Sequence, residues 1–133
     1  MKKAVVYASK LGRTRKTAEY IAKALDADLF DVKKVRSVSD YDLVVFGSGI
    51  YAGGISGPLR TFIESDLHVL RGKRTAFFVC CRFDGEKAEA QLAGATEILG
   101  NTLVSAYFSG KRKNDHDADN KLRAFIGSVR DII

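Results

Sequence analysis

The turn Tyr7-Ala8-Ser9-Lys10-Leu11-Gly12-Arg13-Thr14 joins an apolar run to a segment with helical periodicity. The apolar residues before the turn are typical of a buried strand, and Gly12 permits a tight change of direction. After Thr14, apolar residues recur with the spacing of one helix face, at Ala18, Ile21, Ala22 and Leu25. A buried strand that leads through a short turn into a helix indicates one unit of a parallel α/β sheet.

The same turn has the features of an anion site. Backbone N–H groups at a helix N-terminus attract anions, and Ser9 and Thr14 add hydroxyl donors. Arg13, Arg15 and Lys16 precede the first acid of this helix, although acids are normally favoured there. The turn therefore predicts a phosphate site. The alternative is an ordinary strand-to-helix turn that happens to be basic. A Walker loop is excluded because no Gly-Lys-Ser/Thr ending follows.

Apolar runs and helical patterns alternate along the whole chain, which predicts one α/β domain over residues 1–133. Strands buried on both faces are apolar throughout, so the runs around Val5, Val44 and Phe77 are expected in the middle of the sheet. The more polar runs around Phe30 and Ser105 are expected at its edges. This ranking fits a five-stranded parallel sheet in the order 2-1-3-4-5. The expected strands are 3–8, 29–32, 43–47, 75–81 and 102–108. The expected helices begin at about Thr14, at Pro58 and at Glu86, and the last helix carries the apolar residues from Leu122 to Ile133.

In such a sheet, ligands bind at the carboxyl ends of the strands, beside strands one and three. The glycine-rich stretch 47–57 leaves strand three at that point. Gly47, Gly49 and Ala52 match a dinucleotide fingerprint, but further glycines delay the next helix, and a nicotinamide site is the weaker alternative. We expect a loop whose backbone approaches a flat ring, with Ile50 and Tyr51 in contact. The alternative is that Tyr51 has no ligand and packs on its own loop.

A third loop, Cys81-Arg82-Phe83-Asp84-Gly85, leaves strand four at the same edge. Phe83 could pack against the ring from its other side, with Arg82 supplying positive charge nearby. The alternative is a simple turn in which Asp84 caps the following helix. The sequence leaves both open.

The composition narrows the class of partner. The 133 residues carry a net charge of +6, which favours acidic partners or phosphate ligands. The cations are scattered along the sequence, which argues against nucleic acid as a partner.

Cys80 and Cys81 are adjacent, so a disulfide between them is geometrically poor and a reducing cytoplasm is expected. No apolar stretch has transmembrane length. The stretch 111–119 reads as a solvated loop with capping acids, and no metal site is expected.

Together, the motif at 7–14 and the motif at 41–53 resemble the flavodoxin-like domain family over nearly the whole chain. The nearest branch contains the menaquinone-dependent protoporphyrinogen dehydrogenases. The resemblance implies a flavodoxin-like three-layer sandwich that binds FMN. It also implies an electron carrier or small flavin-dependent oxidoreductase, working with a redox partner protein or a small acceptor such as a quinone. Porphyrinogen oxidation and a non-redox module for a phosphorylated ligand are the alternatives.

The resemblance also implies three groups of cofactor-binding residues and no catalytic side chain. The group within residues 9–14 would hold the FMN phosphate. The groups within residues 49–53 and 81–85 would line the two sides of the isoalloxazine ring. This chain differs from ordinary flavodoxins in its basic charge and in Leu11, which replaces a hydroxyl residue. It also lacks the long late insertion of the porphyrinogen-oxidising members. The three groups are Ser9, Lys10, Leu11, Gly12, Arg13 and Thr14; Gly49, Ile50, Tyr51, Ala52 and Gly53; and Cys81, Arg82, Phe83, Asp84 and Gly85.

Overall fold

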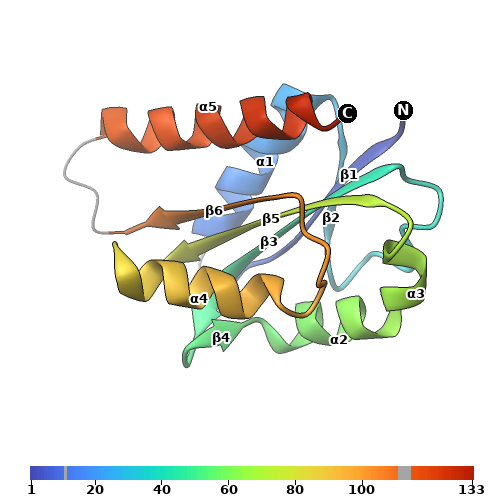
Figure 1. The fold of residues 1–133 in the computed structure, drawn as a ribbon, viewed down its shortest axis with the longest axis horizontal. Helices are drawn as coiled ribbons and strands as arrows, with labels where there is room; N and C mark the ends of the chain where they lie inside the picture. Colours follow the sequence, from blue (N-terminus) through green and yellow to red (C-terminus); the bar gives the residue numbers. More distant parts are fainter. Residues whose placement is uncertain (11, 111–114) are drawn as a thin grey trace.

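A twisted parallel sheet forms the middle layer of the computed structural model, which describes residues 1–10, 12–110 and 115–133 (Figure 1). The strands are β1 (Lys3–Ala8), β2 (Asp28–Asp31), β3 (Leu43–Tyr51), β4 (Gly54–Ile55), β5 (Arg74–Cys81) and β6 (Val104–Ser109). The helices are α1 (Arg13–Leu25), α2 (Gly57–Ser65), α3 (Leu67–Leu70), α4 (Glu86–Thr96) and α5 (Asp115–Asp131).

The strand order is β2-β1-β3-β5-β6, with every neighbouring pair parallel. This confirms the predicted flavodoxin-like order, in which β5 and β6 are the fourth and fifth strands predicted. One strand was not predicted. The two-residue β4 pairs antiparallel with the end of β3, with Ile50 opposite Ile55. So short a strand, beside Gly53 and containing Gly54, has no periodicity that a sequence pattern can reveal.

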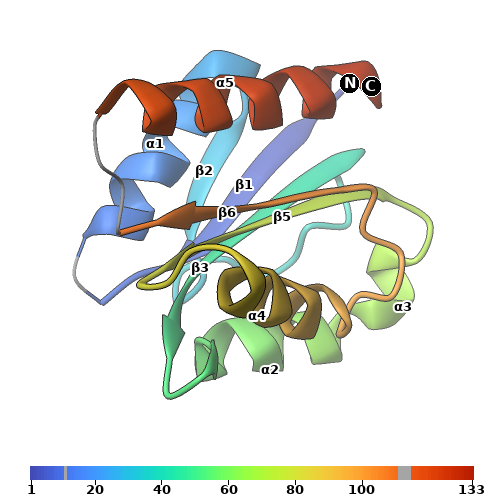
Figure 2. The same cartoon turned by 60° about the vertical axis from the view of Figure 1, so that its left-hand side comes forward.

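The helices cover the two faces of the sheet unequally. Figures 1 and 2 show α1 and α5 on one face and α2, α3 and α4 on the other. Alternate residues of each central strand enter the two cores, as strand geometry requires. Val5, Val45 and Phe78 belong to the core under α1 and α5, whereas their neighbours Val6, Phe46 and Phe77 belong to the opposite core.

Two predicted helix boundaries were wrong. The last helix begins at Asp115, inside the stretch predicted as a solvated loop. Acidic residues are typical of the sequence at a helix start, so the spacing of three aspartates over 115–119 could have been read as a helix signal. The helix predicted after Pro58 breaks at Asp66, which caps α2 and precedes the short α3. The carboxyl ends of β1, β3 and β5 remain together at one edge of the sheet, as predicted.

Candidate cofactor site

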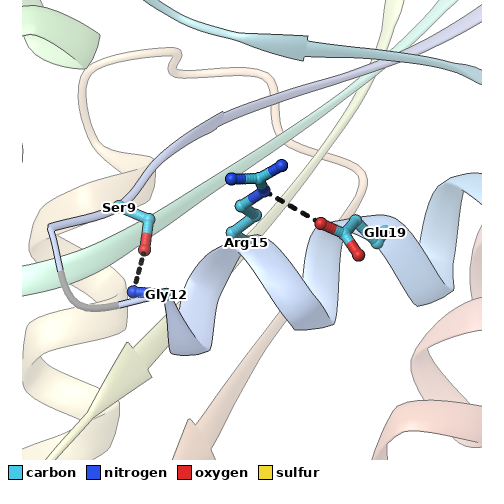
Figure 3. A network of polar contacts seen from close by, with 4 residues as sticks. All are labelled: Ser9, Gly12, Arg15 and Glu19. Carbon is cyan, nitrogen blue, oxygen red and sulfur yellow. Dashed lines mark hydrogen bonds and ion pairs between the residues drawn. The ribbon is translucent and has the colours of Figure 1, made fainter.

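The first predicted loop folds as a tight turn into α1. Gly12 caps the helix with a left-handed backbone (φ 88°), which a residue without a side chain adopts at no steric cost. The Gly12 N–H donates to Ser9 Oγ at 3.0 Å (Figure 3). Thr14 is buried in the first turn. Leu11, also predicted for this loop, lies outside the described residues.

Arg13 and Arg15, at the start of α1, both have partners among the described residues. Arg15 pairs with Glu19 at 2.9 Å one turn later (Figure 3). The Arg13 guanidinium turns toward the sheet, where it donates to the carbonyl oxygens of Cys81 at 3.1 Å and Phe108 at 2.6 Å. A surplus of cations at this helix start therefore does not by itself indicate an anion. The anion-binding capacity of the loop lies in its backbone N–H groups and hydroxyls.

The second predicted loop is largely a strand. β3 continues to Tyr51, and Ala52 and Gly53, both with positive φ, turn the chain into β4. A Cβ at Gly47 would overlap the ring of Phe78, so this glycine serves close packing inside the sheet. The dinucleotide fingerprint opens directly into a helix. Because β4 intervenes here, the match through Gly47, Gly49 and Ala52 does not describe a nicotinamide site.

Tyr51 folds back over the glycine beside it and reaches the first loop. A Cβ at Gly49 would lie 2.7 Å from the Tyr51 hydroxyl oxygen, so only glycine leaves room for this ring. The hydroxyl accepts a hydrogen bond from the Lys10 N–H at 3.0 Å, and Lys10 Nζ lies 4.6 Å from the ring centroid. Tyr51 therefore connects the first and second loops.

The third loop is held by Asp84. Its Oδ1 accepts the Gly85 N–H at 2.9 Å and the Tyr107 hydroxyl at 2.8 Å. These two donors, the Tyr107 hydroxyl foremost, lower the pKa of Asp84 below its ordinary value. Gly85, not Asp84, occupies the N-cap position of α4. The capping alternative for Asp84 was therefore wrong. Tyr107 was missed, because nothing in its own segment shows that it reaches another loop.

Cys81 begins the third loop and faces the cleft as a thiol. Burial is the largest influence on this group and raises its pKa above the ordinary value. The Sγ donates to the Phe83 carbonyl at 3.3 Å. A thiol with a raised pKa carries little thiolate, so Cys81 serves as a polar wall of the cleft.

The three segments meet at one cleft. A hollow of about 180 Å³ lies between the first loop, the end of β3 and the end of β5. A second hollow of about 290 Å³ continues from it, and the two share Ile50 and Arg82. Phe83 lines this second, outer hollow together with Ala52, Gly53 and Gln91. The inner hollow is lined by Ser9, Arg13, Thr14, Gly49, Tyr51, Cys80 and Cys81 as well.

This geometry fits a phosphate joined to a flat ring. Hydroxyl donors gather at the helix end of the cleft, and the remainder is lined by Ile50 and Phe83 together with the polar side chains of Arg82 and Gln91. A larger hollow of about 580 Å³ between α4, β6 and α5 lies away from the first and second loops.

Within the described residues, no group of three His, Cys, Asp or Glu side chains could hold a metal ion. None of the described helices combines the length and hydrophobicity needed to cross a membrane.

Comparison with known proteins agrees with the fold. A family model for the flavodoxin domain matches residues 4–118, and the chain belongs to this family. An uncharacterised protein of Methanocaldococcus jannaschii is 29% identical over 136 residues, covering 87% of this chain and 89% of the relative.

Two solved structures share the fold at low sequence identity. The flavodoxin of Streptococcus pneumoniae superposes with a TM-score of 0.77 at 15% identity, over 100% of both chains. A flavoprotein from Lactobacillus acidophilus, solved in complex with FMN, gives a TM-score of 0.65 at 18% identity. That match covers 90% of this chain and 97% of the flavoprotein.

Proposed function

We propose that this chain binds FMN in the cleft at the carboxyl edge of the sheet and acts as a small electron-carrying flavoprotein. The observation that carries the proposal is the convergence of the three predicted segments on one cleft, where hydroxyl donors lie beside aromatic and aliphatic side chains. Membership of the flavodoxin family supports FMN as the ligand, as does the FMN complex of the similar Lactobacillus flavoprotein.

In this proposal, the phosphate lies against the turn at residues 9–14. The backbone N–H groups at the start of α1 and the buried Thr14 hydroxyl would donate to its oxygens. A phosphate that takes the Lys10 N–H has to displace the Tyr51 hydroxyl that now occupies it. This exchange would free the Tyr51 ring to lie along one side of the flavin.

The ring would lie between the end of β3 and the third loop. Ile50 and Tyr51 would contact one side and Phe83 the other, with the exposed Arg82 supplying positive charge. FMN, when bound, supplies the redox chemistry, and the protein supplies binding, orientation and electrostatics. The expected partner is a redox protein or a small acceptor. Two adjacent cysteines that remain thiols favour a reducing, cytoplasmic location.

The first test is the purified protein itself. It should be yellow, and denaturation should release FMN in about equimolar amount. A colourless protein that ignores added FMN would refute the proposal. Porphyrinogen oxidation is distinguished by direct turnover assays, since an electron carrier exchanges electrons with a partner and leaves porphyrinogens unchanged.

A substitution tests the phosphate end. Thr14→Val keeps the shape of the buried side chain but removes its hydroxyl. A hydrogen bond to a charged group contributes about 1.5–3 kcal/mol, so FMN affinity should fall about 10- to 100-fold. The control is Thr61→Val on the exposed side of α2, which should leave the affinity unchanged. Equal affinities for both variants would remove Thr14 from the site.

A further inference from the structure

Arg13 belongs to the first loop by its backbone and to the third loop by its side chain. It is the first residue of α1. Its Nη1 donates to the Cys81 carbonyl at 3.1 Å, and its Nη2 donates to the Phe108 carbonyl at 2.6 Å. The partly buried guanidinium therefore joins the start of α1 to the ends of β5 and β6, which lie 68 and 95 residues later in the sequence.

The two carbonyls lie where the sheet ends. Cys81 is the last residue of β5, and Phe108 is the next-to-last residue of β6. Carbonyls that leave a sheet need other donors, and the fork of a guanidinium can supply two at once. The Gly110 N–H also donates to the Cys81 carbonyl, at 2.7 Å. A Cβ at Gly110 would lie 3.2 Å from Arg13 Nη1, so this glycine leaves room for the guanidinium.

The bridge sits directly before the loop that lines the outer hollow. Arg82 and Phe83 follow Cys81 at once, and both line that hollow. By fixing the Cys81 carbonyl, Arg13 fixes the direction in which the loop leaves β5. Arg13 also lines the inner hollow beside Ser9 and Thr14, with its guanidinium already held by these two carbonyls.

We propose that Arg13 is a positioning residue for the ring-binding loop 81–85 and that its side chain is not a phosphate ligand. The proposal rests on the proposed function, because it assigns the loop to the flavin ring. The family resemblance assigns Arg13 to the group that holds the FMN phosphate, and that assignment and this proposal predict different effects of an Arg13 substitution. A phosphate ligand affects only phosphorylated flavins, whereas a positioning residue for the loop affects every flavin.

The test compares FMN with riboflavin, which has the same ring without the phosphate. Arg13→Gln should weaken the binding of both by a similar factor, about tenfold, so that the ratio of the two affinities stays near its wild-type value. Thr14→Val should change that ratio, because it affects FMN alone. Arg15→Gln, which breaks only the exposed pair with Glu19, should change neither affinity. A selective loss of FMN binding in Arg13→Gln would overturn the proposal, as would unchanged binding of both flavins.

A second measurement needs no flavin. Amide hydrogen exchange of the segment 82–85 should be faster in Arg13→Gln than in wild type and unchanged in Arg15→Gln. Unchanged exchange in a folded Arg13→Gln protein would also overturn the proposal. If that variant does not fold, Arg13→Lys keeps the charge but loses the two-pronged donor, and the same comparisons apply. A wild-type protein that binds neither flavin would refute the proposed function, while the exchange experiment would still test the role of Arg13.

Discussion

The Tyr107 hydroxyl joins the last strand of the sheet to the third loop through Asp84. Its hydrogen bond of 2.8 Å lowers the pKa of Asp84, so the folded state favours the carboxylate. A lowered pKa stabilises the fold above the ordinary carboxyl pKa of about 4, and that contribution is lost as the pH falls through the folded-state pKa. Lys121, whose Nζ lies 3.9 Å from the Tyr107 ring centroid, adds a minor attraction of the same sign.

Tyr107→Phe tests this contact. Removing the hydroxyl takes away the largest cause of the shift, so the pKa of Asp84 should rise toward its ordinary value. A titration of the carboxyl carbon by NMR measures this directly. Tyr20→Phe is the control, because Tyr20 is exposed on α1. An unchanged Asp84 pKa in Tyr107→Phe would show that the hydroxyl does not hold the carboxylate in solution.

At this scale the sequence predicted which segments meet but not which side chains join them. The turn at residues 9–14 and the third loop lie at one cleft, as expected. The partner of Asp84 is 23 residues away, and the partners of Arg13 are 68 and 95 residues away. No local pattern encodes such pairs, because they depend on which strands become neighbours and on which way each side chain turns.

Among the elements, β3 carries a glycine, Gly47, beside a large apolar residue of the neighbouring strand. Gly47 lies opposite Phe78 of β5, and a Cβ would overlap that ring. Gly47→Ala should therefore destabilise the protein by about 1–3 kcal/mol, the usual cost of overpacking a core. Urea denaturation would measure the change.

The matched control for this substitution is Gly54→Ala. Gly54 lies in β4 with no neighbouring atom within 4 Å of an added Cβ. The substitution Gly54→Ala should therefore change the free energy of unfolding by less than about 0.5 kcal/mol. Equal effects of the two substitutions would show that Phe78 can move aside and that close packing does not require Gly47.

The same stretch shows why element boundaries were harder to predict than element order. Apolar runs buried on both faces marked β1, β3 and β5 as central, and the sheet order followed from them. The glycines of 47–54 read as a loop, yet β3 runs on to Tyr51. Buried packing opposite Phe78 and pairing with β4 keep this segment extended, and both are tertiary effects.

On the scale of the whole molecule, the positive charge should affect the flavin's redox equilibrium. Reduced flavin tends to be anionic, so the net charge of +6 should give a reduction potential above that of acidic flavodoxins. The exposed Arg82 lines both hollows and is the local cation most suited to this role. A unit charge at about 8 Å in water interacts by about 0.5 kcal/mol.

Arg82→Glu reverses that charge and should lower the potential by on the order of 40 mV per electron, since tenfold in equilibrium corresponds to about 59 mV. Spectroscopic redox titration measures it at low salt. Arg74→Glu is the control, because it makes the same change in net charge at the opposite edge of the sheet, where β5 begins. If both variants shift the potential equally, the effect belongs to net charge and not to Arg82.

The bridge made by Arg13 also has a consequence for synthesis on the ribosome. Residue 13 is synthesised before its second acceptor, which lies 95 residues later. At about 5–20 residues per second, translation of that interval takes roughly 5–19 seconds. Until then the nascent chain has the first turn without the carbonyls that receive its guanidinium. The bridge can therefore form only after Phe108 in β6, the last strand of the sheet, has been synthesised.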